Sequence, residues 1–166
     1  MISKNKITLW AVVIILFLTG LADFLNHIGY GIAYQGSDSM PKGWYFYTPA
    51  RFPLHRDQIV VFKPTPLWQE YLEGHHWLLS GALLMKPVAA VPGDLICIRD
   101  HQLYINQQKI TAIVADYAPG KALPELSFCR RLLPGEYWML STHIKRSFDS
   151  RYFGPVDELQ VIGLVH

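Results

Sequence analysis

The 166-residue sequence lacks any concentration of charge of one sign. Its 15 Lys and Arg residues against 13 Asp and Glu residues leave a net charge of +2, and the basic residues are spread along the chain. Domains that bind nucleic acid usually gather Lys and Arg on one face, and the sequence carries no nucleic-acid-binding motif. We therefore expect no nucleic acid among its partners.

Patterns typical of metal sites and of common hydrolases are also missing. The seven histidines include one adjacent pair, His75 and His76, and none shows the i, i+4 or Cys/His spacing that metal sites use. There is no GxSxG motif and no spacing that suggests a serine, histidine and aspartate triad. We expect no metal and no cofactor. An enzyme with this sequence would therefore need catalytic residues other than metal ligands or a serine, histidine and aspartate triad.

Cysteine is scarce, with Cys97 and Cys129 the two in the sequence. In an exported domain a disulfide can form and persist, so these two could be paired. Two buried free thiols acting as small hydrophobic side chains are the alternative, and the sequence leaves both open. It contains no internal repeat or low-complexity tract, and its length suits one globular domain with an appendage.

The appendage is an almost wholly apolar stretch at residues 7–25, close in length to the ~20 residues that a membrane-spanning helix needs. Lys4 and Lys6 precede it, and positive charge is preferentially kept on the cytoplasmic side. We expect a single pass with the amino terminus inside and the rest outside. Gly20 and Ala22 would also suit a signal peptide cut after Ala22, but the stretch is long for a signal core, which favours a retained anchor.

Beyond an anchor assigned to residues 1–28, residues 29–166 show the pattern of an antiparallel β domain. Proline and glycine recur between short runs rich in Val, Ile, Phe and Tyr. Pro92-Gly93 and Pro134-Gly135 suit type II turns that begin strands, and "DHQ" and "NQQ" within residues 100–108 suit tight hairpins of a meander. The clearest strand candidates are residues 58–62, 95–99, 102–106, 136–141 and 159–165.

One segment departs from the β pattern. Residues 67–74, "LWQEYLEG", have apolar and polar positions that suit a short amphipathic helix. We expect it to be an excursion between strands, either a cap over the sheet or a surface flap that touches membrane or substrate.

Lys86 has a placement that suggests chemistry. It lies in the apolar stretch "LLMKPVAAV", where a charged ammonium is costly to bury. Desolvation lowers the pKa of a lysine from its ordinary ~10.4, and a neutral amine near pH 7 can accept the proton of a serine hydroxyl. A lysine at the edge of a strand is the non-catalytic alternative.

Three separated segments resemble, in order, the sequence boxes of the type I signal peptidases, which are membrane-anchored serine–lysine proteases. "SDSMP" at residues 37–41 is similar to their nucleophile box, and "KPVAAVPGD" at residues 86–94 to their lysine box. "SFDSRYFGPV" at residues 147–156 is similar to the carboxy-terminal box with its DSR triplet. The small size and the first two boxes most resemble the conjugative-transfer signal peptidases of the TraF type.

The resemblance implies a mostly antiparallel β domain of the signal-peptidase type, with the serine–lysine pair in an apolar groove near the membrane. Ser39 would be the nucleophile that forms an acyl-enzyme, and Lys86 would be the general base. Ser37 would help to stabilise the oxyanion, and Ser147 would orient the lysine amine. Ordinary turn and loop serines are the alternative for Ser37 and Ser147.

Around this site, the resemblance implies that Asp149 and Arg151 form a structural ion pair, and Met40 is expected to pack under the nucleophile. Two segments depart from the general pattern of the family. Residues 141–146, "STHIKR", replace an expected glycine–aspartate–asparagine stretch, and residues 56–57, Arg-Asp, replace a Gly-Asp pair. Neither departure affects the expected nucleophile or base.

The implied function is a serine endopeptidase that matures an exported pilin precursor for a conjugative transfer (type IV secretion) apparatus. Some relatives of the TraF type also join the new ends into a cyclic pilin. A general signal peptidase that acts on many secreted preproteins and a non-catalytic, membrane-tethered assembly module are the alternatives. The expected partners are the precursor and the lipid bilayer, and the expected location is the inner (cytoplasmic) membrane with the catalytic domain on the periplasmic side.

Overall fold

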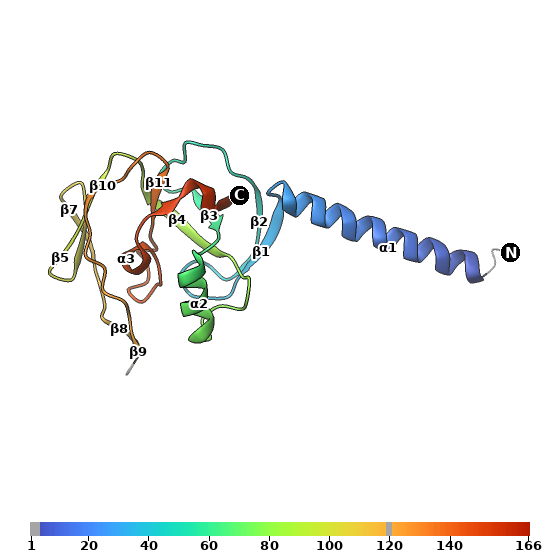
Figure 1. Cartoon of the computed structure of the whole chain (residues 1–166), viewed down its shortest axis with the longest axis horizontal. Coiled ribbons are helices and arrows are strands. Elements are labelled where there is room, and N and C mark those ends of the chain that lie inside the picture. Colours follow the sequence, from blue (N-terminus) through green and yellow to red (C-terminus); the bar gives the residue numbers. More distant parts are fainter. Residues whose placement is uncertain (1–3, 119–120) are drawn as a thin grey trace.

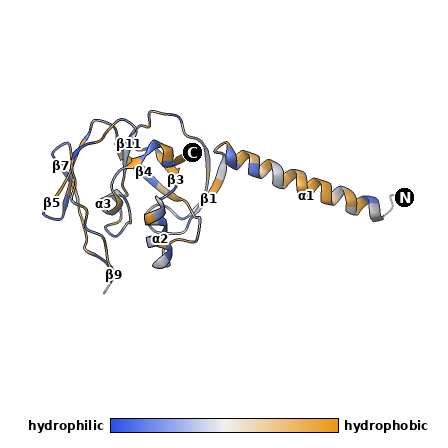
Figure 2. Ribbon diagram, in the orientation of Figure 1, coloured by the Kyte–Doolittle hydropathy of each residue, from blue (hydrophilic) through white to orange (hydrophobic). Residues whose placement is uncertain are grey.

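A computed structural model describes residues 4–118 and 121–166 of the chain. Its first element is the long helix α1 (Lys4–His27), which projects away from a β domain formed by the remaining residues (Figure 1). Most residues of this helix are apolar (Figure 2), and their large side chains are exposed. Lys6–His27 has a mean hydropathy of 2.2 and is long and apolar enough to cross a membrane. This helix fits the expected membrane anchor.

In the part of the β domain that the structure describes, one large and two small sheets are present and every strand pair is antiparallel, which confirms the predicted fold class. The seven-stranded sheet has the order β1-β2-β13-β3-β4-β11-β12, and the others have the orders β10-β5-β6-β7 and β8-β9. The strands of the large sheet are β1 (Gly31–Gln35), β2 (Gly43–Pro49), β3 (Ile59–Phe62), β4 (Leu84–Ala90), β11 (Glu136–Met139), β12 (Val156–Asp157) and β13 (Val161–Val165).

The remaining elements are short. The small sheets consist of β5 (Leu95–Arg99), β6 (Gln102–Ile105), β7 (Gln108–Ala112), β8 (Asp116–Ala118), β9 (Lys121–Ala122) and β10 (Cys129–Arg131). The short helices are α2 (Pro66–Gly74), α3 (Ser150–Phe153) and the 3-10 turn η1 (Glu158–Gln160). The helix predicted at residues 67–74 is therefore present as α2.

The turns follow the predicted chemistry. Gly93 and Gly135 have φ angles of 89° and 83°, and the residue after each glycine donates its backbone N–H to the residue three positions earlier, at 3.1 and 3.0 Å. Both are type II turns, in which glycine meets a positive φ without a steric penalty. Residues 100–101 and 106–107 also have positive φ angles, between 50° and 70°, and connect β5, β6 and β7 as tight hairpins.

Two of the predicted strands were too long by two residues, and those predicted at residues 58–62 and 102–106 were too long by one. The strand expected at residues 159–165 begins at Val161, because Asp157 and Gln160 form a reciprocal capping box that turns the preceding residues into η1. This turn leaves Leu159 92% exposed, so its apolar side chain does not belong to a buried strand face. The strand expected at residues 136–141 ends at Met139.

A disulfide joins Cys97 of β5 to Cys129 of β10. The two residues face each other in the register of these strands, with their Cα atoms 4.0 Å apart. Of the two states that the sequence left open, the structure therefore has the paired one.

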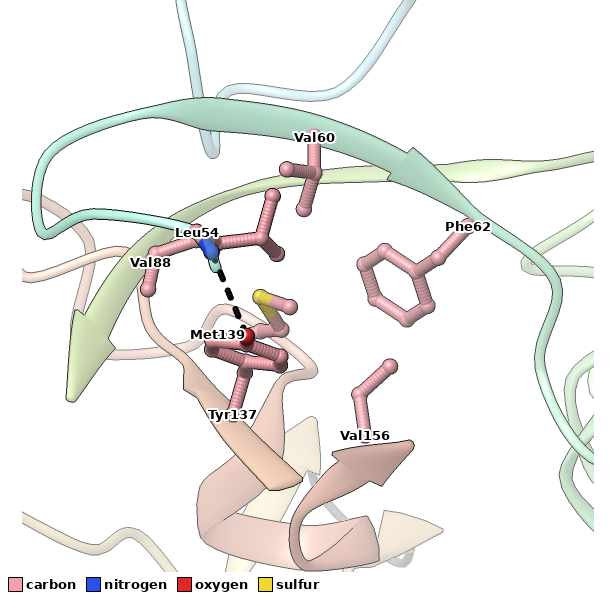
Figure 3. Close-up of a cluster of buried hydrophobic side chains, with 7 residues drawn as sticks. All are labelled: Leu54, Val60, Phe62, Val88, Tyr137, Met139 and Val156. Carbon is pink, nitrogen blue, oxygen red and sulfur yellow. Dashed lines mark hydrogen bonds between the residues drawn. The ribbon is translucent and has the colours of Figure 1, made fainter. Parts of the chain in front are cut away.

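A buried cluster packs between β3 and β4 on one side and β11 and β12 on the other, all strands of the large sheet (Figure 3). The backbone N–H of Leu54 donates to the Tyr137 hydroxyl at 3.2 Å, so the phenol of this cluster keeps a hydrogen bond. None of the side chains is more than 2% exposed: Leu54, Val60, Phe62, Val88, Tyr137, Met139 and Val156. Because close-packed side chains resist displacement, this cluster fixes β4, the strand that carries Lys86.

Candidate active site

The predicted nucleophile box forms the connection between β1 and β2, at residues 36–42. Ser39 lies in this connection and is 6% exposed. The next residue, Met40, is 8% exposed and belongs to a buried cluster that includes Met85 of β4. Met40 thus packs beneath the connection and ties it to the strand that carries Lys86.

Lys86 meets Ser39 directly. Its strand, β4, lies between β3 and β11, so Lys86 is on a central strand of the sheet and not at an edge. The side chain is 5% exposed, and Nζ lies 2.6 Å from Ser39 Oγ, a hydrogen bond between residues 47 positions apart in the sequence. Burial lowers the pKa of Lys86 to about 8, while Asp149 raises it and Arg151 lowers it to a smaller extent. About a tenth of the amine is then neutral at pH 7.

Ser37 and Gln35 complete a hydrogen-bond network around Ser39. The hydroxyl oxygens of Ser37 and Ser39 are 2.9 Å apart. Gln35, the last residue of β1, is 7% exposed and donates from Nε2 to Ser37 Oγ at 2.7 Å, to the Ser37 carbonyl at 2.9 Å and to Ser39 Oγ at 3.2 Å. Sequence reasoning missed Gln35, since it precedes the box and no local pattern marks a glutamine at the end of a strand.

Asp149 and Arg151 form a buried ion pair with two contacts. Arg151 Nε donates to Asp149 Oδ1 and Arg151 Nη2 donates to Asp149 Oδ2, each at 2.8 Å. Both side chains are fully buried. Arg151 Nη2 also donates to the Ser147 carbonyl at 3.1 Å. The ion pair thereby holds the backbone of the segment that carries Ser147.

Ser147 lies close to the network without joining it. It is 3% exposed and lines the same groove as Lys86, but its hydroxyl has no hydrogen-bond partner in the part of the chain that the structure describes. A buried hydroxyl without a partner is costly, because it has lost its hydrogen bonds to water. Its expected role in orienting the lysine stays a prediction.

A groove of about 900 Å³ opens over these residues, and Ser37, Ser39, Lys86 and Ser147 line its polar part. The end of α2 and the segment after it form an apolar wall, which places the predicted helix beside the site. The rings of Tyr71 in α2 and Phe148 stack at 5.8 Å and join this wall to the segment of Ser147. The apolar lining consists of Leu72, Trp77, Leu78, Leu79, Ala82, Leu83, Leu84, Met85, Ile144 and Phe148.

The two segments that depart from the family pattern have definite places. Arg56 donates to both carboxylate oxygens of Asp94, at 2.5 and 2.6 Å, and so holds the turn that follows β4. In the other segment, Ile144 and Arg146 line the groove. Within residues 4–118 and 121–166, no group of three or more His, Cys, Asp or Glu side chains is placed to hold a metal ion.

Comparisons with known proteins indicate the family of this chain. Residues 5–166 match the model of the family described as signal peptidase, peptidase S26. A conjugal transfer protein TraF of Agrobacterium tumefaciens is 28% identical over 164 residues, which cover 90% of this chain and 92% of that protein. Signal peptidase I V of Bacillus subtilis is 25% identical over 122 residues, 68% of this chain and 64% of the relative.

The crystal structure of a signal peptidase I from Enterococcus faecalis V583 also aligns with this chain, at 24% identity and a TM-score of 0.41. The alignment covers 70% of this chain and 100% of the chain in that structure. That score is too low to support a conclusion, whereas the family match covers nearly the whole chain. The chain therefore belongs to the signal peptidase family, peptidase S26.

Proposed function

We propose that this chain is a membrane-anchored serine endopeptidase that matures an exported precursor, the pilin of a conjugative transfer (type IV secretion) apparatus. The hydrogen bond of 2.6 Å between Lys86 Nζ and Ser39 Oγ carries the proposal, because it joins a buried hydroxyl to an amine with a lowered pKa. Relatives named TraF in Agrobacterium tumefaciens and Escherichia coli, each 28% identical, support the conjugative setting.

In the first step, Ser39 Oγ attacks the carbonyl carbon of the scissile peptide bond while its proton moves to the neutral amine of Lys86. Lys86 then gives this proton to the leaving nitrogen, the peptide C–N bond breaks, and the acyl group remains on Ser39. The lowered pKa of Lys86, about 8, suits both transfers near neutral pH.

The remaining serines stabilise this chemistry. The Ser37 hydroxyl and the backbone N–H of Ser39 donate to the oxyanion of the tetrahedral intermediate. The Ser147 hydroxyl, which has no partner in the described part of the structure, is free to accept from the ammonium of Lys86 during the reaction. Water then attacks the acyl-enzyme with Lys86 as base and releases a linear product. If the amino group of the precursor itself attacks, the product is cyclic.

The proposed membrane placement puts residues 1–28 in and before the bilayer and residues 29–166 on the periplasmic side of the inner membrane. Lys4 and Lys6 at the start of α1 favour an amino terminus in the cytoplasm. The disulfide between Cys97 and Cys129 fits an oxidising compartment outside the cytoplasm.

The hairpin of β1 and β2 supports a site close to the membrane surface. Ile32, Tyr34, Trp44 and Phe46 share one face of it and are 52–75% exposed, and Ile32 pairs with Phe46 as Tyr34 does with Trp44. The hairpin follows α1 after three residues, and Trp and Tyr favour the interface between membrane and water. A precursor held by its own apolar segment would then meet the groove at this surface.

The test is mass spectrometry of the candidate pilin from cells that carry the wild-type protein or one of four variants. Ser39→Ala and Lys86→Ala should leave the precursor at full length. Ser127→Ala and Lys109→Ala, which change exposed residues, should leave maturation intact. Normal maturation with Ser39→Ala or Lys86→Ala would rule out the proposed mechanism.

The same spectra distinguish the two products, because a cyclic pilin is lighter by one water than the linear cleaved one. Substrate range separates a dedicated enzyme from a general signal peptidase. Deletion of a dedicated enzyme should leave the processing of other secreted preproteins unchanged, and their accumulation would favour the general enzyme.

A further inference from the structure

We infer that Gln35 is a positioning residue that sets the direction of the hydrogen bonds leading through Ser37 and Ser39 to Lys86. This inference rests on the proposed roles of Ser39 and Lys86. Gln35 Nε2 lies within 2.7 to 3.2 Å of three oxygen atoms of the two serines, and the side chain is 7% exposed. It therefore contacts the nucleophile and its neighbour together, without belonging to either motif.

The chemistry of the neighbours determines which end of the Gln35 amide faces the serines. The Ser37 carbonyl can only accept a hydrogen bond, and it lies 2.9 Å from the Gln35 amide. The atom that faces it must therefore be the nitrogen, since two facing oxygens would have no hydrogen between them. The backbone of Gln35 pairs with Gly43 at the end of β1, which fixes where the side chain starts.

A hydroxyl can donate or accept, so a pair of serines alone has no preferred direction. With Gln35 as the donor at 2.7 Å, Ser37 Oγ accepts and keeps its own hydrogen for Ser39 Oγ at 2.9 Å. The Gln35 amide has two hydrogens for three acceptors, so its longest contact, 3.2 Å to Ser39 Oγ, shares one of them, and Ser39 Oγ accepts mainly from Ser37. The hydrogen of Ser39 is left for the neutral amine of Lys86 at 2.6 Å. The bonds thus run from Gln35 through the serines to Lys86.

This direction is the one that the reaction needs. The proton of Ser39 must leave toward Lys86, and the hydrogen of Ser37 must be free to turn to the oxyanion of the substrate. A donor behind Ser37 favours both, because a hydroxyl that accepts a hydrogen bond becomes a better donor. Gln35 touches neither the scissile bond nor the amine, and so it acts through the two serines.

A carboxylate in place of the Gln35 amide would reverse the first bond at almost constant size. It can only accept, so the Ser37 hydrogen would turn toward it and away from Ser39 and the oxyanion. Its negative charge near Lys86 would also favour the ammonium over the neutral amine. Gln35→Glu therefore tests direction and charge, while Gln35→Met removes the donor without adding charge.

The experiment measures cleavage of an internally quenched peptide by the full-length protein in detergent micelles. The peptide has alanine at the first and third positions before the scissile bond, the small-residue pattern at which signal peptides are cut. Gln35→Met should lower kcat about tenfold and change KM less than about threefold, as expected for one lost hydrogen bond that matters in the transition state. Gln35→Glu should lower kcat about a hundredfold at pH 7 and move the rising limb of the pH profile to higher pH by about one unit. Gln108→Glu, which adds the same charge at an exposed position of β7, should change neither.

The outcomes separate this inference from the proposed function. If Ser39→Ala is inactive while both Gln35 variants keep the wild-type kcat, the role of Gln35 is wrong and the proposed function stands. If Ser39→Ala keeps its turnover, both are wrong. A merely structural role would lower kcat through a smaller folded fraction, measured by thermal unfolding, and leave the pH limb in place. A Gln35→Glu limb at the wild-type pH therefore contradicts the inference even if kcat falls.

Discussion

Replacing Lys86 by methionine should abolish the proposed activity and also stabilise the folded protein at pH 7. The pKa of Lys86 is about 8, well below its ordinary value of 10.5, and the side chain is 5% exposed, so solvent screens its charge little. One pKa unit corresponds to ~1.4 kcal/mol, so keeping this ammonium in the fold costs about 3 kcal/mol at pH 7. Methionine has a similar volume and no charge, and Ser39 keeps Ser37 and Gln35 as partners.

The difference in stability between the wild type and the methionine variant should depend on pH. Between pH 8 and 10.5, the unfolded chain still binds a proton at Lys86 that the folded chain has released, so the free energy of unfolding of the wild type rises with pH. The methionine variant has no such dependence. The extra free energy of unfolding of the variant over the wild type should be greatest below pH 8 and fall by about 2 kcal/mol between pH 7 and pH 9.5. It should vanish above pH 10.5.

Urea unfolding of the full-length protein in detergent micelles, followed by tryptophan fluorescence at pH 7 and pH 9.5, measures this difference. Lys109→Met replaces an exposed lysine and should match the wild type at both pH values. The reasoning is refuted if Lys86→Met is less stable than the wild type at pH 7, or if its advantage is the same at both pH values.

Three further predictions concern the site and its supports. The kcat/KM of the wild type should rise about tenfold between pH 7 and pH 9, as Lys86 with its pKa of about 8 loses its proton; a flat profile would exclude it as the base. Arg151→Met should lower the free energy of unfolding by about 3–5 kcal/mol, because the buried Asp149 carboxylate loses its partner, and urea unfolding should show part of this loss restored by adding Asp149→Asn. Replacing Cys97 and Cys129 together by serine should cost about 4 kcal/mol, since their bond closes a loop with a sequence separation of 32, and equal urea midpoints with and without reductant would contradict this value.

Much of the local structure could be predicted because it depends on neighbouring residues. Gly93 and Gly135 after proline specify turns, and the apolar length of residues 7–25 specifies a helix long enough to span a membrane. Strand ends were less predictable. At Leu159 an apolar side chain belongs to a capped turn, because the hydrogen bonds between Asp157 and Gln160 outweigh its preference for a strand.

The candidate site could be predicted only in part for a similar reason. Ser39 and Lys86 lie in segments that resemble family motifs, so their sequence context identifies them. Gln35 has no such context, since its role comes from three hydrogen bonds that exist only once β1 ends beside the serines. The groove wall around Trp77 was equally hidden, because α2 must first pack against the segment of Phe148.

The sequence by itself therefore determined the apolar anchor, the antiparallel β pattern, the tight turns and the candidate serine and lysine. The first three depend on composition, periodicity or residue spacing over a few neighbouring positions, whereas the serine and the lysine were identified by resemblance to family motifs. Only the tertiary structure decided that Cys97 and Cys129 are bonded and that Lys86 is buried on a central strand 2.6 Å from Ser39. The physical reason is that pairing, burial and a lowered pKa arise between segments far apart in the chain, and the packing of the sheet alone brings those segments together.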